Sequence, residues 1–181
     1  MKTRKLTSMA ILAALSVVMV VIIHFPIFPA APYLEYDPAD IPVLICSFAF
    51  GPWEGLAVAV IAASIQGLTV SASSGLYGII MHILATAAYV LTAGFVYRAK
   101  KTKKEAVISL ALGCMAMTAV MVGANLIVTP AFTGMPVSSI RALILPVIVP
   151  FNLIKSGING IVTFFVYKRV SPILHKEKKT S

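Results

Sequence analysis

Long apolar runs, separated by short polar or basic segments, account for most of the chain. A helix needs about 20 apolar residues to span a bilayer, and hydropathy of this kind identifies such helices. We expect six spans, at residues 6–25, 40–50, 54–70, 76–97, 105–128 and 147–167. The pattern therefore predicts an all-α integral membrane protein, a bundle of six transmembrane helices, in which residues 1–181 form a single transmembrane domain.

Proline, glycine and polar residues mark the connections between these runs. The segment 33–40 is polar and holds three of the six acidic residues of the chain. We expect Asp40 to cap the second helix at its N-terminus, with Pro42 in the first turn. Because proline disrupts the interior of a helix, we expect Pro130 to end the fifth helix and a loop to continue to Pro146.

Composition agrees with a membrane protein and excludes two other classes. Hydrophobic residues make up 59% of the chain and charged residues only 12%, against roughly 25% charged residues in soluble domains. A soluble domain of 181 residues could not bury so much apolar surface. A disordered chain is excluded for the same reason, because disorder requires low hydrophobicity.

The net charge of +9 comes from three basic clusters that flank apolar runs. Thirteen of the fifteen Lys and Arg residues lie at residues 2–5, 98–104 and 168–179. Six spans put these clusters on one side of the membrane, which the positive-inside rule makes cytoplasmic. We therefore expect both termini to be cytoplasmic and the charge to set topology rather than to bind nucleic acid. The first apolar run is longer than the 7–15 residues of a signal peptide, so it is expected to remain as a helix.

The sequence offers little for catalysis. It has no Walker-type phosphate loop, and its three histidines lack metal-ligand spacing. Cys46 and Cys114 lie in apolar runs and are expected to behave as small hydrophobic residues. His82 has no carboxylate in its own span that could form a catalytic pair. We expect no enzyme activity, no metal and no cofactor, and any ATP hydrolysis must occur in another subunit.

Polar side chains at bilayer depth are costly, so each one needs an explanation. Lys155 lies roughly 13 Å into the sixth helix. It either forms an internal ion pair with Asp40 or Glu35, or faces a ligand in a cavity. Asn152 and Asn159 lie one turn to either side of it, so the three form a polar stripe on one helical face.

Four further residues are weaker candidates for ligand contacts. The amide of Asn125 suits a ring with alternating carbonyl and N–H groups, although an interhelical hydrogen bond explains it equally well. Gln66 and His82 lie alone among apolar neighbours, and His82 is more typical of a core histidine. Tyr36 borders the acidic loop, where an aromatic ring could cover a planar ligand or lie at the membrane interface.

Three sequence runs resemble a known family of membrane proteins. The runs LEYDPADIP at 34–42 and FGPWEG at 50–55 resemble the outer loop and helices two and three of the substrate-binding (S) subunits of energy-coupling factor (ECF) transporters. The run PFNLIKSG at 150–157 is similar to the sixth helix of the riboflavin-specific members. The resemblance covers essentially the whole chain, with the same six spans and the same basic loop after the fourth.

The resemblance implies a function that composition alone does not. Such a subunit binds a vitamin, here riboflavin, at the extracellular side of a prokaryotic plasma membrane. It works with a transmembrane coupling subunit and two ATPase subunits. The resemblance implies flavin contacts for Asn125 and Lys155, and positions near the pocket for Asn152 and Asp40. The full set of candidate binding residues is Leu34, Tyr36, Asp40, Gln66, His82, Asn125, Asn152 and Lys155.

The first helix carries a face of small residues that permits close packing with another helix. Ala10 and Ala14 form a small-x-x-x-small pattern, with Ala13 beside them. Ordinary packing within the chain explains such a face equally well. The family resemblance implies that Ala10, Ala13 and Ala14 dock the coupling subunit.

Two alternatives stay open at this point. Riboflavin members often carry Lys-Asn in the third helix where this chain has Ser64-Ile65-Gln66-Gly67, and residues 75–82 also differ. Another vitamin or planar heterocycle is therefore a second candidate ligand. A self-sufficient secondary transporter is the other alternative, but it requires ionisable relays or inverted repeats near the midplane. Apart from Lys155, the chain has almost no charge there.

Overall fold

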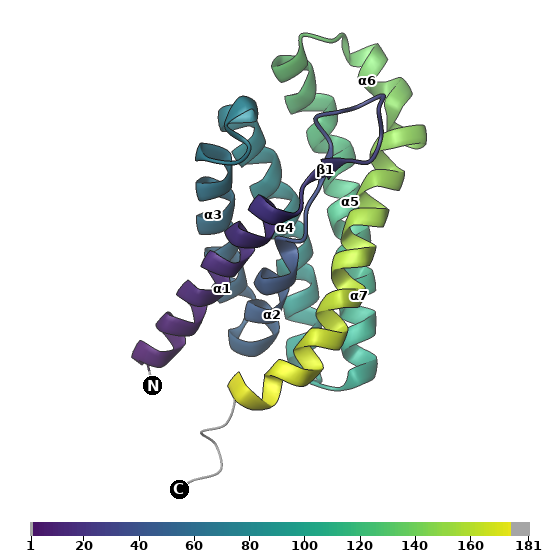
Figure 1. Cartoon of the computed structure of the whole chain (residues 1–181). Coiled ribbons are helices and arrows are strands. Elements are labelled where there is room, and N and C mark those ends of the chain that lie inside the picture. The colour runs from purple at the N-terminus through teal and green to yellow at the C-terminus, as the bar shows by residue number, and fades with distance from the viewer. Residues whose placement is uncertain (1, 175–181) are drawn as a thin grey trace, which may run out of the picture.

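Seven α-helices contain most of the residues that the computed structural model describes, which are residues 2–174. The helices are α1 (Lys2–Ile22), α2 (Asp40–Phe50), α3 (Pro52–Leu68), α4 (Gly75–Ala99), α5 (Lys103–Thr133), α6 (Val137–Leu143) and α7 (Val149–Leu174). A 3-10 turn, Ala72–Ser74, precedes α4, and a π-helix, Ile144–Ile148, joins α6 to α7. Figure 1 shows the long helices forming an elongated bundle around the short α2.

Four stretches of the described chain are long and apolar enough to cross a membrane. They are Thr3–Ile22, Ala72–Ala99, Lys103–Thr133 and Val137–Ser171. With 17 residues, α3 is shorter, and α2 has only 11, roughly 16 Å against a hydrocarbon core of about 30 Å. Ten of the residues of α2 are buried, and it packs on α1, α3, α4 and α7. The predicted helical membrane protein is confirmed, while the count of six spans stays a prediction.

The predicted end of the fifth helix is wrong. Pro130 lies inside α5, which continues to Thr133 and ends at Gly134 in the left-handed conformation, with φ of 70°. Transmembrane helices tolerate proline because neighbouring groups satisfy the freed backbone carbonyl. The expected loop up to Pro146 is mostly α6 and the π-helix, and Pro146 lies within that π-helical turn. The helical stretch that contains the sixth predicted span therefore begins earlier, at Val137.

The segment before α2 also differs from expectation. Asp40 is the first residue of α2 and makes no capping bond, because its carboxylate is held by Thr86 and Asn159 instead. Two short strands, β1 (Phe25–Pro26) and β2 (Glu35–Tyr36), pair antiparallel, so the fold is not purely helical. Pairing of β1 with β2 brings the acidic segment back over the bundle.

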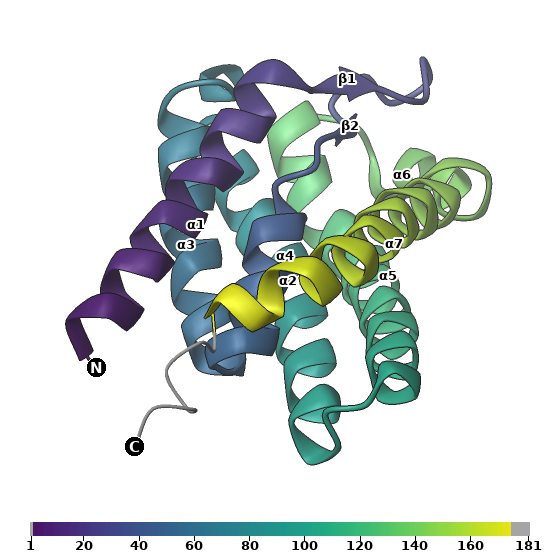
Figure 2. The ribbon, with the colours of Figure 1, turned by 60° about the horizontal axis from the view of Figure 1, so that its bottom comes forward.

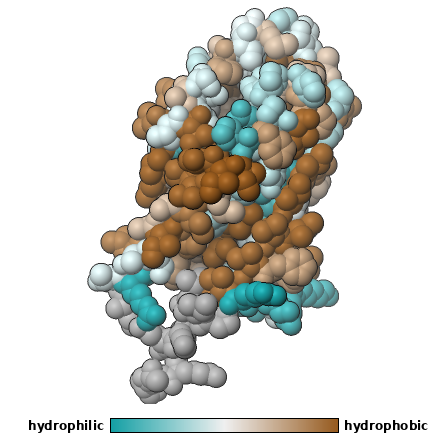
Figure 3. All heavy atoms as spheres, in the orientation of Figure 1, coloured by the Kyte–Doolittle hydropathy of each residue, from teal (hydrophilic) through white to brown (hydrophobic). Residues whose placement is uncertain are grey.

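The described parts of the basic clusters, residues 2–5, 98–104 and 168–169, share one end of the molecule, while Lys176, Lys178 and Lys179 lie outside the described residues. Figure 1 shows the N-terminal end of α1, the connection from α4 to α5 and the C-terminal end of α7 together at the bottom of the view. Figure 3 shows hydrophilic groups at that end and a hydrophobic band above it. The charge pattern predicts that these clusters lie at the same end of the bundle. That this end faces the cytoplasm stays a prediction.

Close packing between helices depends on glycines at their contacts. A Cβ atom on Gly94 of α4 would collide with the Ser47 hydroxyl and would lie 2.9 Å from Cβ and 3.1 Å from Cα of Pro52. A Cβ atom on Gly123 of α5 would meet nothing within 4 Å. The two glycines therefore differ in packing although both lie inside helices.

We predict opposite effects of alanine at these two glycines. Gly94→Ala should lower stability by about 1–3 kcal/mol, because the extra methyl group overpacks the contact of α4 with α2 and α3. Gly123→Ala should leave stability unchanged or raise it by up to about 1 kcal/mol through helix propensity. Unfolding of the purified protein in detergent measures both, and equal shifts would contradict this packing.

Candidate ligand-binding site

A cavity lies in the half of the bundle away from the basic clusters. Five segments line it: residues 33–35, the turn at residues 71–74, the first half of α4, the second half of α5 and the start of α7. Its volume is about 90 Å³. The residues 33–35 belong to the connection between α1 and α2, which Figure 1 shows in the upper half of the bundle, and they form one wall of the cavity.

The walls of the cavity are mostly apolar, with aromatic and sulfur-containing side chains. These are Tyr77, Met81, Met117, Met121, Phe132 and Phe151. Methionine adapts its shape and makes favourable contacts with aromatic rings. Apolar walls with a few converging polar groups are typical of small-molecule sites.

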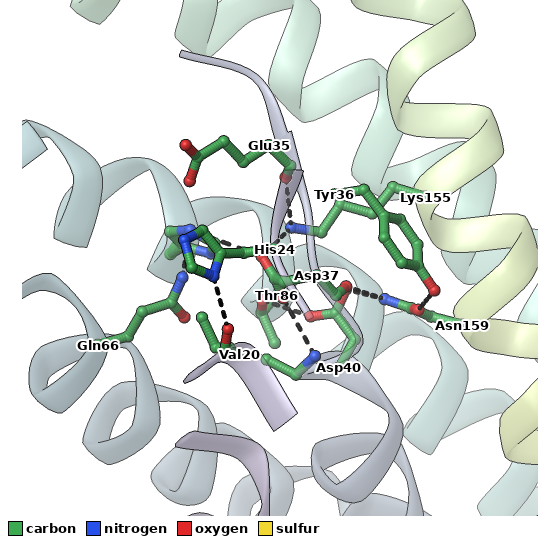
Figure 4. Close-up of polar contacts among 12 residues, drawn as sticks. Val20, His24, Glu35, Tyr36, Asp37, Asp40, Gln66, Thr86, Lys155 and Asn159 are labelled. Atoms are coloured by element: carbon green, nitrogen blue, oxygen red, sulfur yellow. Dashed lines mark hydrogen bonds and ion pairs between the residues drawn. The ribbon is translucent and has the colours of Figure 1, made fainter. Parts of the chain in front are cut away.

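A buried ion pair lies beside this cavity. The ammonium group of Lys155 donates a hydrogen bond to the Asp37 carboxylate at 2.7 Å, and the backbone oxygen of Glu35 is 3.5 Å away (Figure 4). Lys155 is 5% exposed and Asp37 2%. Nε2 of His82 lies 4.0 Å from the same carboxylate. The expected partners of Lys155, Asp40 or the Glu35 side chain, were wrong: the partner is Asp37.

A second set of hydrogen bonds holds the same segment to α7. Nδ2 of Asn159 donates to the Asp37 backbone oxygen and to the Asp40 carboxylate, both at 3.1 Å. The hydroxyl of Tyr36 donates to Asn159 Oδ1 at 3.2 Å. The hydroxyl of Thr86 on α4 donates to Asp40 at 2.7 Å. Residues 36–40 are therefore fixed to α7 by Asn159 and Lys155, which lie one helical turn apart.

The ion pair controls the charge state of Asp37. Burial alone would raise the pKa of this carboxyl, but the charge of Lys155 opposes it. Together with hydrogen bonds from Lys155 and the Ala39 backbone N–H, this charge holds the pKa of Asp37 below its usual value. Asp37 is therefore ionised at neutral pH, and the pair is a true ion pair.

Two buried polar atoms at the cavity wall have no hydrogen-bond partner among the described residues. They are the hydroxyl oxygen of Tyr33 and Oδ1 of Asn152. The other end of the Asn152 amide donates to the Ile148 backbone oxygen at 2.8 Å, which fixes the orientation of the side chain. An unpaired buried polar group costs about 1–3 kcal/mol, so such atoms are rare without a role. Both residues line the cavity.

The structure brings four of the eight predicted binding residues to the cavity. Leu34, His82, Asn152 and Lys155 line it. The other four do not line it. Asn125 bonds the Met121 backbone and Thr129, Gln66 bonds His82, and Tyr36 and Asp40 bond Asn159.

Sequence reasoning missed several residues of the site. Asp37 stood inside the acidic run, but nothing in the sequence distinguished it from Glu35 and Asp40 as the partner of Lys155. Tyr33 was not among the predicted binding residues, yet it lines the cavity and its hydroxyl is buried. The described residues contain no group of three or more His, Cys, Asp or Glu side chains that could hold a metal ion.

The geometry defines a membrane-embedded protein that binds a small molecule between its helices. The chain belongs to the substrate-specific components of ECF transporters, because the model of that family matches residues 4–167. The members of this family are components of transporters.

Relatives and solved structures agree with this assignment. The chain is 27% identical to the riboflavin transporter FmnP of Bacillus subtilis, over 98% of this chain and 97% of the relative. It is 29% identical to the riboflavin transporter RibU of Staphylococcus aureus, over 97% and 94%. The solved S component of a bacterial ECF transporter superposes with a TM-score of 0.83 at 30% identity, covering 97% of this chain and 99% of the other. ThiT from Listeria monocytogenes shares the fold, with a TM-score of 0.67 at 18% identity over 96% and 97% of the two chains.

We predict that Asp37 and Lys155 depend on each other for stability. Asp37→Asn leaves a buried ammonium group without its counter-charge, which should cost about 3–5 kcal/mol. Lys155→Met leaves the carboxylate unpaired and should also destabilise. The double variant buries neither charge of the pair, so it should lose less stability than the sum of the two single losses. Unfolding in detergent at neutral pH measures the cycle.

The same cycle has a defined pH dependence. Because the folded-state pKa of Asp37 is lowered, its contribution is fully present above its unfolded pKa and is lost as the pH falls through the folded value. The difference in stability between the wild type and Asp37→Asn should therefore disappear only in strong acid. Glu105→Gln, at the half-buried first turn of α5, serves as a control that should change stability by less than about 0.5 kcal/mol. Strictly additive single effects would contradict the ion pair.

Proposed function

We propose that this chain is the riboflavin-binding S subunit of an ECF importer in a prokaryotic plasma membrane. It crosses the membrane six times, with both termini and the basic clusters on the cytoplasmic side. The cavity then opens toward the extracellular side, where the vitamin is captured. The riboflavin transporters among its relatives support this ligand, since they match over nearly the whole chain.

The observation that most supports a flavin as the ligand is the Oδ1 atom of Asn152, which has no hydrogen-bond partner among the described residues. The flavin ring is flat and largely apolar, and one edge alternates carbonyl and N–H groups. The apolar walls suit the face of the ring, and Asn152 Oδ1 can accept a hydrogen bond from the ring N–H. Lys155 lines the same wall and can donate to a ring carbonyl while it remains beside Asp37.

The cavity must enlarge when the vitamin binds. Its volume of about 90 Å³ is below the roughly 300–1,000 Å³ of ligand pockets. Residues 33–35 form a wall of the cavity that belongs to no helix. We propose that they move outward as the ligand enters. Residues 36–40 stay in place through their bonds to α7.

Energy for uptake is proposed to come from partner subunits. No Walker-type loop is present in the sequence. A transmembrane coupling subunit docks on the exposed Ala10 and Ala14 of α1, and two ATPase subunits drive the cycle. Ala13 is only 5% exposed and packs in the core of the chain, so it does not belong to this face.

We predict that Asn152→Ala weakens riboflavin binding by about 1–3 kcal/mol, because the ring N–H loses its acceptor. Quenching of flavin fluorescence by the purified protein in detergent measures the affinity. A flavin methylated at the ring N–H should bind the wild type more weakly than riboflavin does. The Asn152→Ala substitution should lower the affinity for this methylated flavin only a little further. Equal effects of the substitution on both flavins would contradict the contact. Absence of riboflavin binding by the wild type would overturn the proposed function itself.

We predict that bulky residues on α1 separate binding from transport. Ala10→Leu and Ala14→Leu should block close approach of the coupling subunit, so riboflavin uptake by cells should fall at least about tenfold. Riboflavin binding by the isolated chain should stay unchanged, because α1 does not line the cavity. Gly123→Leu on α5, where an added Cβ atom meets nothing within 4 Å, is the matched control and should preserve uptake.

A second experiment tests the need for partners. Reconstituted alone in liposomes, the chain should bind riboflavin without accumulating it under a proton or sodium gradient. Addition of the coupling subunit, the ATPases and ATP should start accumulation. Gradient-driven accumulation by the chain alone would show a secondary transporter instead.

A further inference from the structure

An apolar groove runs between α5 and α7 in the half of the bundle at the basic end. Its volume is about 280 Å³, and Val107, Leu110, Gly157, Ile161 and Phe164 are among the residues that line it. Tyr89 of α4 forms its floor, with the hydroxyl turned to the Ser156 backbone oxygen. Almost no polar surface faces the groove, so it suits a hydrocarbon chain rather than a polar ligand.

A second cavity of about 200 Å³ lies at the basic end of the same two helices. Lys101, Lys103 and Lys168 line it, and their side chains are exposed. None of the three forms an ion pair with a residue that the structure describes. Three positive charges therefore converge on one cavity without a described counter-charge.

The two cavities are neighbours, because Phe164 lines both. From Lys103 at the basic end to Cys114 in the groove, α5 rises roughly 16 Å, about half of a 30 Å hydrocarbon core. The apolar groove and the cavity at its basic end together therefore have about the length of one bilayer leaflet. The helices α5 and α7 pack on each other, and Figure 1 shows the lower end of α5 at the same end of the bundle as the C-terminal end of α7.

We propose that this surface binds one anionic phospholipid from the leaflet at the basic end. An acyl chain occupies the groove, and the headgroup phosphate lies among Lys101, Lys103 and Lys168. Basic pockets between membrane helices recognise anionic headgroups, and each nearby lysine adds attraction. Lysine stems also pack against apolar surface while the ammonium groups stay at the interface.

The site lies apart from the other surfaces of the protein. The exposed alanines of α1 are on a helix that packs on α2 and α3, and Figure 2 shows α1 and α5 on opposite sides of the bundle. The ligand cavity is in the other half of α5 and α7. The proposal therefore does not depend on which vitamin the chain binds.

Native mass spectrometry of the purified full chain, with phosphatidylglycerol and phosphatidylcholine at equal concentration, tests the headgroup site. The wild type should retain one phosphatidylglycerol in preference to phosphatidylcholine. The triple variant Lys101→Gln/Lys103→Gln/Lys168→Gln should lose this preference by at least about tenfold. The triple variant Lys100→Gln/Lys104→Gln/Arg169→Gln removes the same charge from neighbouring positions outside the cavity and should keep it.

A glycine substitution tests the groove independently. Gly157 lines the groove, and a Cβ atom there meets nothing within 4 Å, so Gly157→Leu fills the groove without a clash in the core. It should reduce retention of both lipids, whereas Gly123→Leu should not. The melting temperature in detergent confirms that each variant is folded.

Three results would overturn the proposal. The first is a wild type without preference for phosphatidylglycerol. The second is an equal loss of this preference in the two triple variants, which would indicate a general attraction of the lipid to positive charge. The third is a first triple variant that retains phosphatidylglycerol as the wild type does but no longer assembles with the coupling subunit. This result would assign the surface to a protein partner.

Discussion

The buried ion pair between Asp37 and Lys155 determines how the connection between α1 and α2 lies over the bundle. Burying two charges is costly unless each is paired and hydrogen-bonded. Here the ammonium group of Lys155 lies 2.7 Å from the Asp37 carboxylate. The Ala39 N–H donates a further hydrogen bond to this carboxylate, and the Glu35 backbone oxygen accepts one from the ammonium group. A shift of this segment by one residue would leave both charges unpaired, so the pair sets its register on α7.

The ligand site follows from that register. With residues 36–40 fixed, Tyr33 and Leu34 lie over the space between α4, α5 and α7 and complete a cavity. The helices contribute apolar walls because they are apolar around most of their surface, as membrane helices are. Its polar groups include Asn152 and Lys155 on one face of α7, His82 on α4 and residues of the connection itself. One segment thus contributes both the anchor and the cover of the site.

Much of the fold could be predicted from hydropathy, because helical membrane segments must satisfy their backbone internally and are therefore long and apolar. The common end of the basic clusters followed from charge position alone. Pro130 misled the prediction because proline signals a helix end in soluble proteins, whereas α5 continues past it. The pairing of β1 with β2 had no sequence signal, since each strand is only two residues long.

The site was predicted in part, for physical reasons that concern side-chain partners. Lys155 and Asn152 stood out because polar residues are costly at bilayer depth. Their distinct environments could not be seen in the sequence: Asn152 keeps an unpaired oxygen, whereas Asn125 uses both ends of its amide within α5. The choice of Asp37 over Glu35 and Asp40 depended on the path of the chain between β1 and α2.

The structure of the chain with riboflavin bound is the most direct test of this account. The account predicts the ring in the cavity beneath residues 33–35, with its N–H within about 3.2 Å of Asn152 Oδ1 and Lys155 still beside Asp37. A flavin bound outside this cavity, or a ring whose polar edge faces away from Asn152 and Lys155, would contradict it.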